Sequence, residues 1–211
     1  MHVLLHKHSN ETYTALNEWR TKKNITGTSY NLDHKLHKSL PDKTPLYIID
    51  INNDVNRIEG IGILYKCKIK RLYKYNIYPH RERNRYSYKT PFYMKRDALI
   101  ELNNKSKLCI YFLEYVLFYG KKNYKRMEKR FVCFDINILL YAHCLYDNMR
   151  EKNCVYCGKP NNYHICSNMK PNKCLLNYYK RYFEYLLVYF KTLRRRDKRI
   201  ENKSTKIKAL K

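Results

Sequence analysis

The fold is decided by the run Leu46-Tyr-Ile-Ile-Asp-Ile51, the turn Asn52-Asn-Asp54 and the longer run Ile58-Glu-Gly-Ile-Gly-Ile-Leu-Tyr-Lys-Cys-Lys-Ile69. β-branched and aromatic residues dominate both runs, and the Asn/Asp-rich stretch between them is a turn signal. The pattern predicts two strands joined by a short turn. Gly60 and Gly62 lie inside the second strand, which indicates a bulge or a close approach by another backbone or a ligand.

The residues before this pair predict a strand, a helix and a loop. Met1–His6 has the apolar character of a short strand. Ser9 or Asn10 can cap a helix over Glu11–Lys23, where large side chains recur at helical spacing. The stretch Thr26–Ser39 is polar and rich in turn-forming residues, so we expect a loop there.

The residues after the strand pair predict further helices. Asp97–Asn103 fits one or two helical turns, whereas Cys109–Tyr119 is apolar enough to be buried as either helix or strand. Phe131–Tyr146 resembles a strand that leads into a helix. Leu175–Arg199 has one apolar stripe at helical spacing and predicts an amphipathic helix.

Together these patterns predict an α+β protein with a small mixed or barrel-like sheet and flanking helices, followed by a zinc-stapled helical unit. The α+β domain would span residues 1–148 and carry an exposed basic arm at 79–89. Residues 149–200 would form the zinc-binding unit and the amphipathic helix, and 201–211 a disordered basic tail.

The zinc prediction rests on Cys154-Val-Tyr-Cys157-Gly158, in which two thiolates separated by two residues can bind one tetrahedral ion. The predicted ligands are Cys154, Cys157, Cys166 and Cys174, with His164 as an alternative ligand and a set of buried free thiols as the alternative interpretation. No Asp or Glu lies between the first and last of these cysteines to move protons, so the site is expected to be structural rather than catalytic.

The eight cysteines, with no secretory signal, favour metal ligands or buried thiols in a reducing, intracellular setting, nuclear or cytoplasmic. No apolar run reaches the roughly 20 residues that a membrane-spanning helix needs, so no membrane partner is expected. Motifs for a serine hydrolase, a phosphate-binding loop or a metalloprotease are absent from the sequence.

Positive charge is the strongest functional signal. The 211 residues include 44 Lys/Arg and 18 Asp/Glu, a formal net charge of +26, together with 23 tyrosines. Nucleic acid neutralises such charge and stacks on aromatic rings. Lys, Asn, Ile and Tyr also have A/T-rich codons, so codon bias in an A/T-rich genome is the alternative explanation of the positive charge. However, 27 of the cations fall in 66–96, 121–130 and 191–211, beside four acidic residues, and codon bias alone would spread them more evenly.

These basic stretches contain the residues that we expect to contact nucleic acid, the cations through phosphates and exposed tyrosines through base stacking. The predicted contacts are Lys66, Lys68, Lys70, Arg71, Lys74, Arg81, Arg83, Arg85, Tyr86, Tyr88, Lys89, Lys121, Lys122, Lys125, Arg126, Arg194, Arg195 and Arg196, and Tyr73, Tyr75 and Tyr78 are further candidate stackers.

Other residues with metal-binding chemistry receive a simpler interpretation. Asp50 and Asp54 flank the turn between the two strands and are interpreted as turn-forming residues, although they could bind a metal. The histidines near the start of the chain are interpreted as surface or base-contacting residues. They are His2, His6, His8, His34 and His37.

The segment from Pro45-Leu-Tyr-Ile-Ile-Asp-Ile to Gly60-Ile-Gly-Ile-Leu-Tyr resembles the PUA-like barrel, in particular its EVE and YTH branches. The resemblance covers about residues 1–145. It implies a small β-barrel that holds a nucleotide base in an aromatic cage. YTH-type cages use several tryptophans and this chain has one, so Tyr47, Tyr65 or Tyr86 would have to replace them.

The sequence thus predicts a non-catalytic nucleic-acid-binding protein, RNA being favoured over DNA, with a structural zinc site. One alternative is a divergent zinc-knuckle nuclease. The other is a structural or protein-interaction protein whose charge reflects composition.

Overall fold

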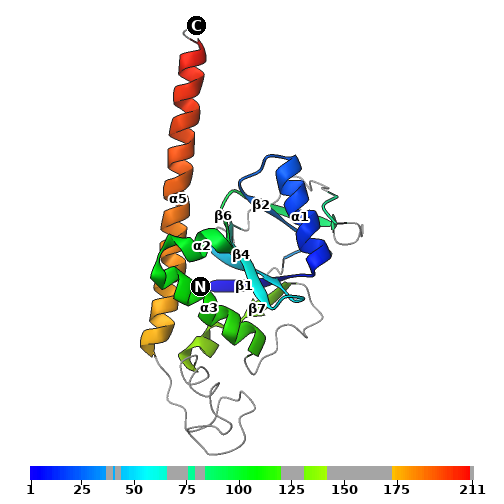
Figure 1. Cartoon of the computed structure of the whole chain (residues 1–211), viewed down its shortest axis with the longest axis vertical. Coiled ribbons are helices and arrows are strands. Elements are labelled where there is room, and N and C mark those ends of the chain that lie inside the picture. The colour runs from blue at the N-terminus through cyan, green and yellow to red at the C-terminus, as the bar shows by residue number, and fades with distance from the viewer. Residues whose placement is uncertain are drawn as a thin grey trace, which may run out of the picture.

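The computed structural model describes residues 1–36, 40, 44–65, 76–78, 84–119, 131–141 and 173–209, except for the side chains of 119, 140, 141, 174, 175 and 196–209. Within these residues the protein is a mixed α+β structure. A five-stranded sheet and a two-stranded sheet are accompanied by four α-helices and a short 3-10 helix (Figure 1).

The centre of the large sheet is the strand pair that the sequence predicts. β3 (Pro45–Asn52) and β4 (Arg57–Tyr65) are antiparallel, with a register shift between Asp50 and Ile51. β1 (His2–His8) lies parallel to β3, which confirms the predicted first strand and places it inside the sheet.

Two shorter strands complete the large sheet. β6 (Tyr93–Lys95) pairs with β4, and β7 (Phe131–Phe134) pairs with β1, both antiparallel. The order is β6-β4-β3-β1-β7, so β6 and β7 form the two edges. Among the described strands the sheet is therefore open and does not close into a barrel.

The first helix forms where the sequence predicts it. α1 (Asn10–Lys22) is capped by Ser9, whose side-chain oxygen accepts a hydrogen bond from the Thr12 amide at 3.3 Å while Thr12 Oγ1 accepts from the Ser9 amide at 2.9 Å. This reciprocal capping box satisfies two amides that a helix start would leave unpaired.

The ambiguous middle of the chain is helical. α2 (Arg96–Leu102) confirms the predicted short helix, and α3 (Asn104–Tyr119) shows that the apolar run at 109–119 is helix rather than strand. β7 is followed by the 3-10 helix η3 (Ile136–Tyr141), and the remainder of the helix expected there lies outside the described residues.

The prediction of a loop at Thr26–Ser39 is wrong for Thr28–Leu32. Residues Thr28–Leu32 form β2, which pairs antiparallel with β5 (Tyr86–Thr90) and is buried throughout. The polar sequence misleads because β2 obtains its hydrogen bonds from a strand more than 50 residues away, and such tertiary pairing outweighs local propensity. The same pairing also corrects the prediction of an exposed arm at 79–89, because the last four of these residues belong to β5.

Alternation along the strands separates two layers of core. Val3 and Leu5 point to the side of the sheet covered by α3 and α5 (Lys173–Ala209). Leu4 points to the opposite side, where it packs against Tyr30 of β2. Since strand side chains alternate between faces, the two layers follow directly from the period of two.

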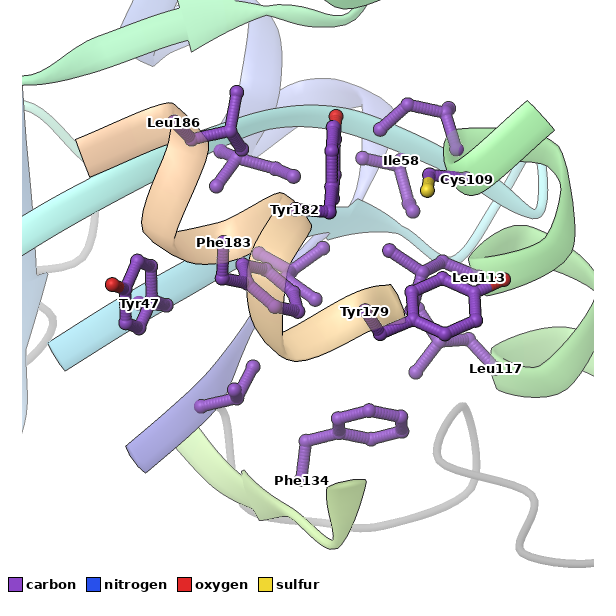
Figure 2. Packing of buried hydrophobic residues seen from close by; sticks show 14 of the residues in the cluster. Tyr47, Ile58, Cys109, Leu113, Leu117, Phe134, Tyr179, Tyr182, Phe183 and Leu186 are labelled. Atoms are coloured by element: carbon purple, nitrogen blue, oxygen red, sulfur yellow. The ribbon is translucent and has the colours of Figure 1, made fainter. Parts of the chain in front are cut away.

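Helix α5 belongs to the core of this domain. Figure 2 shows Tyr179, Tyr182, Phe183 and Leu186 of α5 against side chains of α3 and of the sheet, including Tyr47 of β3. The predicted amphipathic helix is confirmed, and it packs on the residues expected to form the first domain. It continues to Ala209, through most of the segment for which we expected disorder, and extends well past the sheet (Figure 1).

Among the described helices, none contains a stretch long and apolar enough to cross a membrane.

Candidate nucleic-acid interface

A pocket of 680 Å³ lies between the start of α3 and the first turns of α5. Its volume falls in the range of about 300–1,000 Å³ that is typical of small-molecule sites, and is large enough for a nucleotide. It is lined by Asn103, Asn104, Lys105, Tyr178, Arg181, Tyr182 and Tyr185.

On the α5 side, the pocket is lined by a row of aromatic and cationic side chains. Tyr178, Arg181 and Tyr185 are three and four residues apart, so they follow one another along the same face of the helix. Both tyrosines are exposed, at 38% and 43%. Exposed tyrosines present ring faces to solvent, and the guanidinium between them supplies charge and planar hydrogen-bond donors.

The wall of the pocket is held in place by Tyr182. Its hydroxyl is 2.8 Å from Ser106 Oγ, and both residues are buried. Burial raises the pKa of Tyr182, which keeps the phenol neutral. This contact joins α5 to α3 and sets the spacing between the two sides of the pocket.

The α3 side offers polar groups and a second cation. Asn103 lies in the turn between α2 and α3 and caps α3, because its side-chain oxygen accepts from the Ser106 amide at 2.8 Å. Asn103, Asn104 and Lys105 are all exposed. No acidic side chain is among the described residues that line the pocket, so Lys105 and Arg181 face it without a neutralising partner there.

The basic residues predicted from sequence are divided between two sides of the sheet. Arg85 and Lys89 are exposed on or beside β5, in the layer that contains β2 and α1. Arg194 and Arg195 are exposed on α5, in the opposite layer. The structure therefore does not bring these two groups together.

The predicted stacking tyrosines are less accessible than expected. Tyr88 is buried and its hydroxyl accepts a hydrogen bond from the Leu36 amide at 2.9 Å. Tyr78 is also buried, and Tyr86 is half-buried. In this conformation the rings of Tyr78 and Tyr88 do not lie on the surface.

The tyrosines named for an aromatic cage do not converge. Tyr47 packs against Phe183 of α5, with ring centroids 5.1 Å apart, on one side of the sheet. Tyr65 packs in the same layer, whereas Tyr86 contacts the cluster on the other side. One cage cannot contain both Tyr47 and Tyr86.

Most other predicted contacts lie outside the described residues. They are Lys66, Lys68, Lys70, Arg71, Tyr73, Lys74, Tyr75, Arg81, Arg83, Lys121, Lys122, Lys125 and Arg126, together with the zinc ligands Cys154, Cys157, Cys166 and the alternative His164. Cys174 and Arg196 belong to α5, but the positions of their side chains are not described.

Sequence reasoning missed the pocket because only the apolar stripe of α5 and its arginines at 194–196 were considered. The signal was present in Tyr178, Arg181 and Tyr185, which fall beside the apolar stripe at helical spacing. Asn103 and the first residues of α3, Asn104 and Lys105, carry no comparable signal.

No protein-family model, no curated protein and no solved structure matches the chain.

Proposed function

We propose that the protein binds single-stranded nucleic acid without cleaving it, and that one nucleotide of the strand occupies the pocket between α3 and α5. The observation that carries this proposal is the joint presence of three tyrosines, Lys105 and Arg181 in one surface pocket with no acidic residue among its described lining. Aromatic platforms flanked by cations are the usual means of holding unpaired bases without reading their sequence.

Each part of a nucleotide has a matching group in the pocket. The exposed rings of Tyr178 and Tyr185 offer stacking surfaces for a base. Lys105 and Arg181 would pair with phosphate oxygens, and the amides of Asn103 and Asn104 would donate or accept hydrogen bonds at the sugar or the base edge.

The strand would continue along α5. Arg194 and Arg195 are exposed 13 and 14 residues beyond Arg181, which is about 20 Å along a helix that rises 1.5 Å per residue. They would contact phosphates a few nucleotides away from the pocket. RNA is the favoured form, because RNA-binding proteins characteristically stack splayed, unpaired bases on aromatic rings and Arg guanidinium planes.

The structural zinc site belongs to the same proposal. Cys154, Cys157, Cys166 and Cys174 would bind the ion, with His164 as the alternative ligand. Cys174 is the second residue of α5 and lies one helical turn before Tyr178. A zinc ion there would fix the start of the helix that carries the pocket.

The test is a titration of labelled, unstructured RNA and DNA of about 12 nucleotides, followed by fluorescence anisotropy. Affinity should fall by orders of magnitude between about 50 and 200 mM salt, since several phosphate contacts release counterions. The double variant Tyr178→Ala/Tyr185→Ala should bind roughly 5–150-fold more weakly for each stacked base lost. Tyr111→Ala is the matched control, because Tyr111 is 44% exposed on α3 but does not line the pocket.

A second pair of variants separates charge from stacking. Arg181→Gln should weaken binding and reduce the slope of affinity against salt, whereas Lys22→Gln on α1 should leave both unchanged. Salt-independent affinity, or equal losses in the pocket variants and in their controls, would refute the pocket. Cleavage of the labelled strand would instead favour the nuclease alternative. A failure to bind nucleic acid at low salt would favour the protein-interaction alternative.

A further inference from the structure

A second cluster of chemically active side chains lies on the opposite side of the sheet from α5. His6 and His8 are two residues apart on β1, so both point to the face covered by α1 and β2. Asp50 on β3 lies directly beside His6 in the parallel register. The fold thus brings two imidazoles and a carboxylate to one place from strands separated by more than 40 residues.

The polar atoms of the three side chains lie close together. His6 Nδ1 lies 2.9 Å from Asp50 Oδ1, and His8 Nε2 lies 3.6 Å from the same oxygen. The three ligand atoms lie within 4.8 Å of one another. All three residues are buried, which corrects the sequence-based interpretation of Asp50 as a turn residue and of His6 and His8 as surface groups.

The ring nitrogens of His8 are buried without a hydrogen-bond partner among the described residues, which indicates a missing ligand in this cluster. The His8 side chain is only 1% exposed. Burial of a polar group without a partner is energetically costly. Asp50 Oδ2 likewise has no partner at hydrogen-bond distance among the described residues. A ligand that accepts electron pairs from both groups would remove these costs.

We propose that His6, His8 and Asp50 bind a divalent transition-metal ion, with zinc as the best match. Two imidazole nitrogens and one carboxylate oxygen are a ligand set that zinc accepts, at bond lengths near 2.0–2.2 Å. Tetrahedral bonds of that length separate neighbouring ligand atoms by about 3.3 Å. The separations of 2.9 and 3.6 Å from Asp50 Oδ1 lie on either side of this value, so small side-chain movements would bring three of the four tetrahedral ligands into place.

The surroundings orient the carboxylate for this role. An Arg20 terminal nitrogen lies 3.8 Å from Asp50 Oδ2, and the Arg20 guanidinium stacks over the Tyr93 ring at 4.0 Å. Arg20 thereby attracts one carboxylate oxygen and leaves Oδ1 directed at the imidazoles. Charged partners of this kind commonly hold a ligating carboxylate in position.

Strand β4 leaves room for the side chains of Tyr30 and Tyr93 next to the cluster. Gly60 lies opposite Asp50 in the antiparallel register, and Gly62 lies two residues further on the same face. The hydroxyl groups of Tyr93 and Tyr30 occupy the space where a Cβ of Gly60 or Gly62 would stand. This confirms the close approach that the two glycines predict.

The ion would link β1 to β3 beneath α1. Because its ligands are buried, the expected role is structural. The site shares no residue with the pocket between α3 and α5 and does not depend on nucleic-acid binding.

The experiment must separate this ion from any zinc held by cysteines. The full chain carrying Cys154→Ser/Cys157→Ser is loaded with Zn²⁺, desalted and analysed for metal by mass spectrometry, with circular dichroism to confirm folding. We expect one zinc per chain, lost in the additional variant His8→Gln. His34→Gln is the matched control and should keep the zinc, because His34 also lies beside an aspartate, Asp33, at 3.7 Å, but is exposed.

Two further measurements keep the proposal falsifiable if the cysteine variant fails to fold. In the otherwise unmutated chain, His8→Gln should lower the zinc content by one equivalent. X-ray absorption at the zinc edge should show that the lost ion had nitrogen and oxygen neighbours only. A zinc content that His8→Gln leaves unchanged, or a lost ion with sulfur neighbours, would overturn the proposal.

Discussion

The hydroxyl of Tyr182 on α5 lies 2.8 Å from Ser106 Oγ in the first turn of α3, and both side chains are buried. This contact is a polar link at the largely apolar boundary between α5 and α3 (Figure 2). It places the exposed tyrosines of α5 opposite the turn that starts α3.

Tyr182→Phe should destabilise the protein by about 1–3 kcal/mol, since it leaves the buried Ser106 hydroxyl without this partner. Urea denaturation measures the loss. The double variant Tyr182→Phe/Ser106→Ala should recover part of the stability, because both polar groups are then gone. Tyr185→Phe, on the exposed side of the same helix, should change stability little; an equal loss there would contradict this assignment.

Gly62→Ala should destabilise the protein by about 1–3 kcal/mol, since the new methyl group would overlap the buried Tyr30 hydroxyl. Adding Tyr30→Phe removes the overlapping oxygen and should reduce the cost of Gly62→Ala. Thermal unfolding of the four proteins of this cycle gives the coupling. Strictly additive effects would show that the two residues do not meet.

Cys109 should resist alkylation in the folded protein. Burial raises the pKa of its thiol to about 12, whereas an unfolded cysteine titrates near 8.5, so the folded chain keeps the proton at pH 9 to 10. Cys133 is exposed and should react under the same conditions. Peptide mapping after iodoacetamide treatment distinguishes the two, and similar labelling of both would contradict the burial.

The same shift predicts a pH dependence of stability. Above about pH 8.5 the unfolded chain binds fewer protons than the folded one, so the free energy of unfolding should decrease by about 1.4 kcal/mol per pH unit from this group. Cys109→Ala should show a shallower decrease than the unmutated protein. Cys133→Ala serves as the control, and its pH profile should follow that of the unmutated protein.

Zinc removal should loosen the start of α5. Cys154→Ser should lose one equivalent of zinc and lower the stability of the helix, because the proposed site includes Cys174 in its first turn. Hydrogen exchange of the α5 amides measures the effect. Unchanged metal content in Cys154→Ser would refute the cysteine site while leaving the His6–His8–Asp50 proposal open to its own test.

The parts of the fold that sequence predicts are those with a local signal. The runs at 46–51 and 58–65 carry β-branched residues, the Ser9 cap begins α1, and the apolar stripe of α5 is regular. β2 was missed because its polar residues are stabilised by a distant partner. A mixed sheet was one of the two predicted forms, but the sequence did not decide between it and a barrel, because the parallel register of β1 and β3 leaves no trace in the spacing of either strand.

The same reason explains why the sequence does not predict the cluster of His6, His8 and Asp50. His6 and His8 show a spacing of two, which on a strand means a shared face, but Asp50 joins them only through tertiary pairing. A strand that places histidines where hydrophobic residues are expected was the available signal. Without knowledge of the neighbouring strand, such histidines look like surface residues.

The position of β1 has a consequence for the order in which the protein matures. β1 leaves the ribosome before either of its neighbours, yet it pairs with β3 at residues 46–52 and with β7 at 131–134. At about 5–20 residues per second, roughly 6–25 s pass between synthesis of β1 and of β7. During that interval one edge of β1 has no partner strand, and His6, His8 and Asp50 already meet once β3 has docked. Early capture of an ion by the nascent chain would hold the first parallel pair together until β7 arrives.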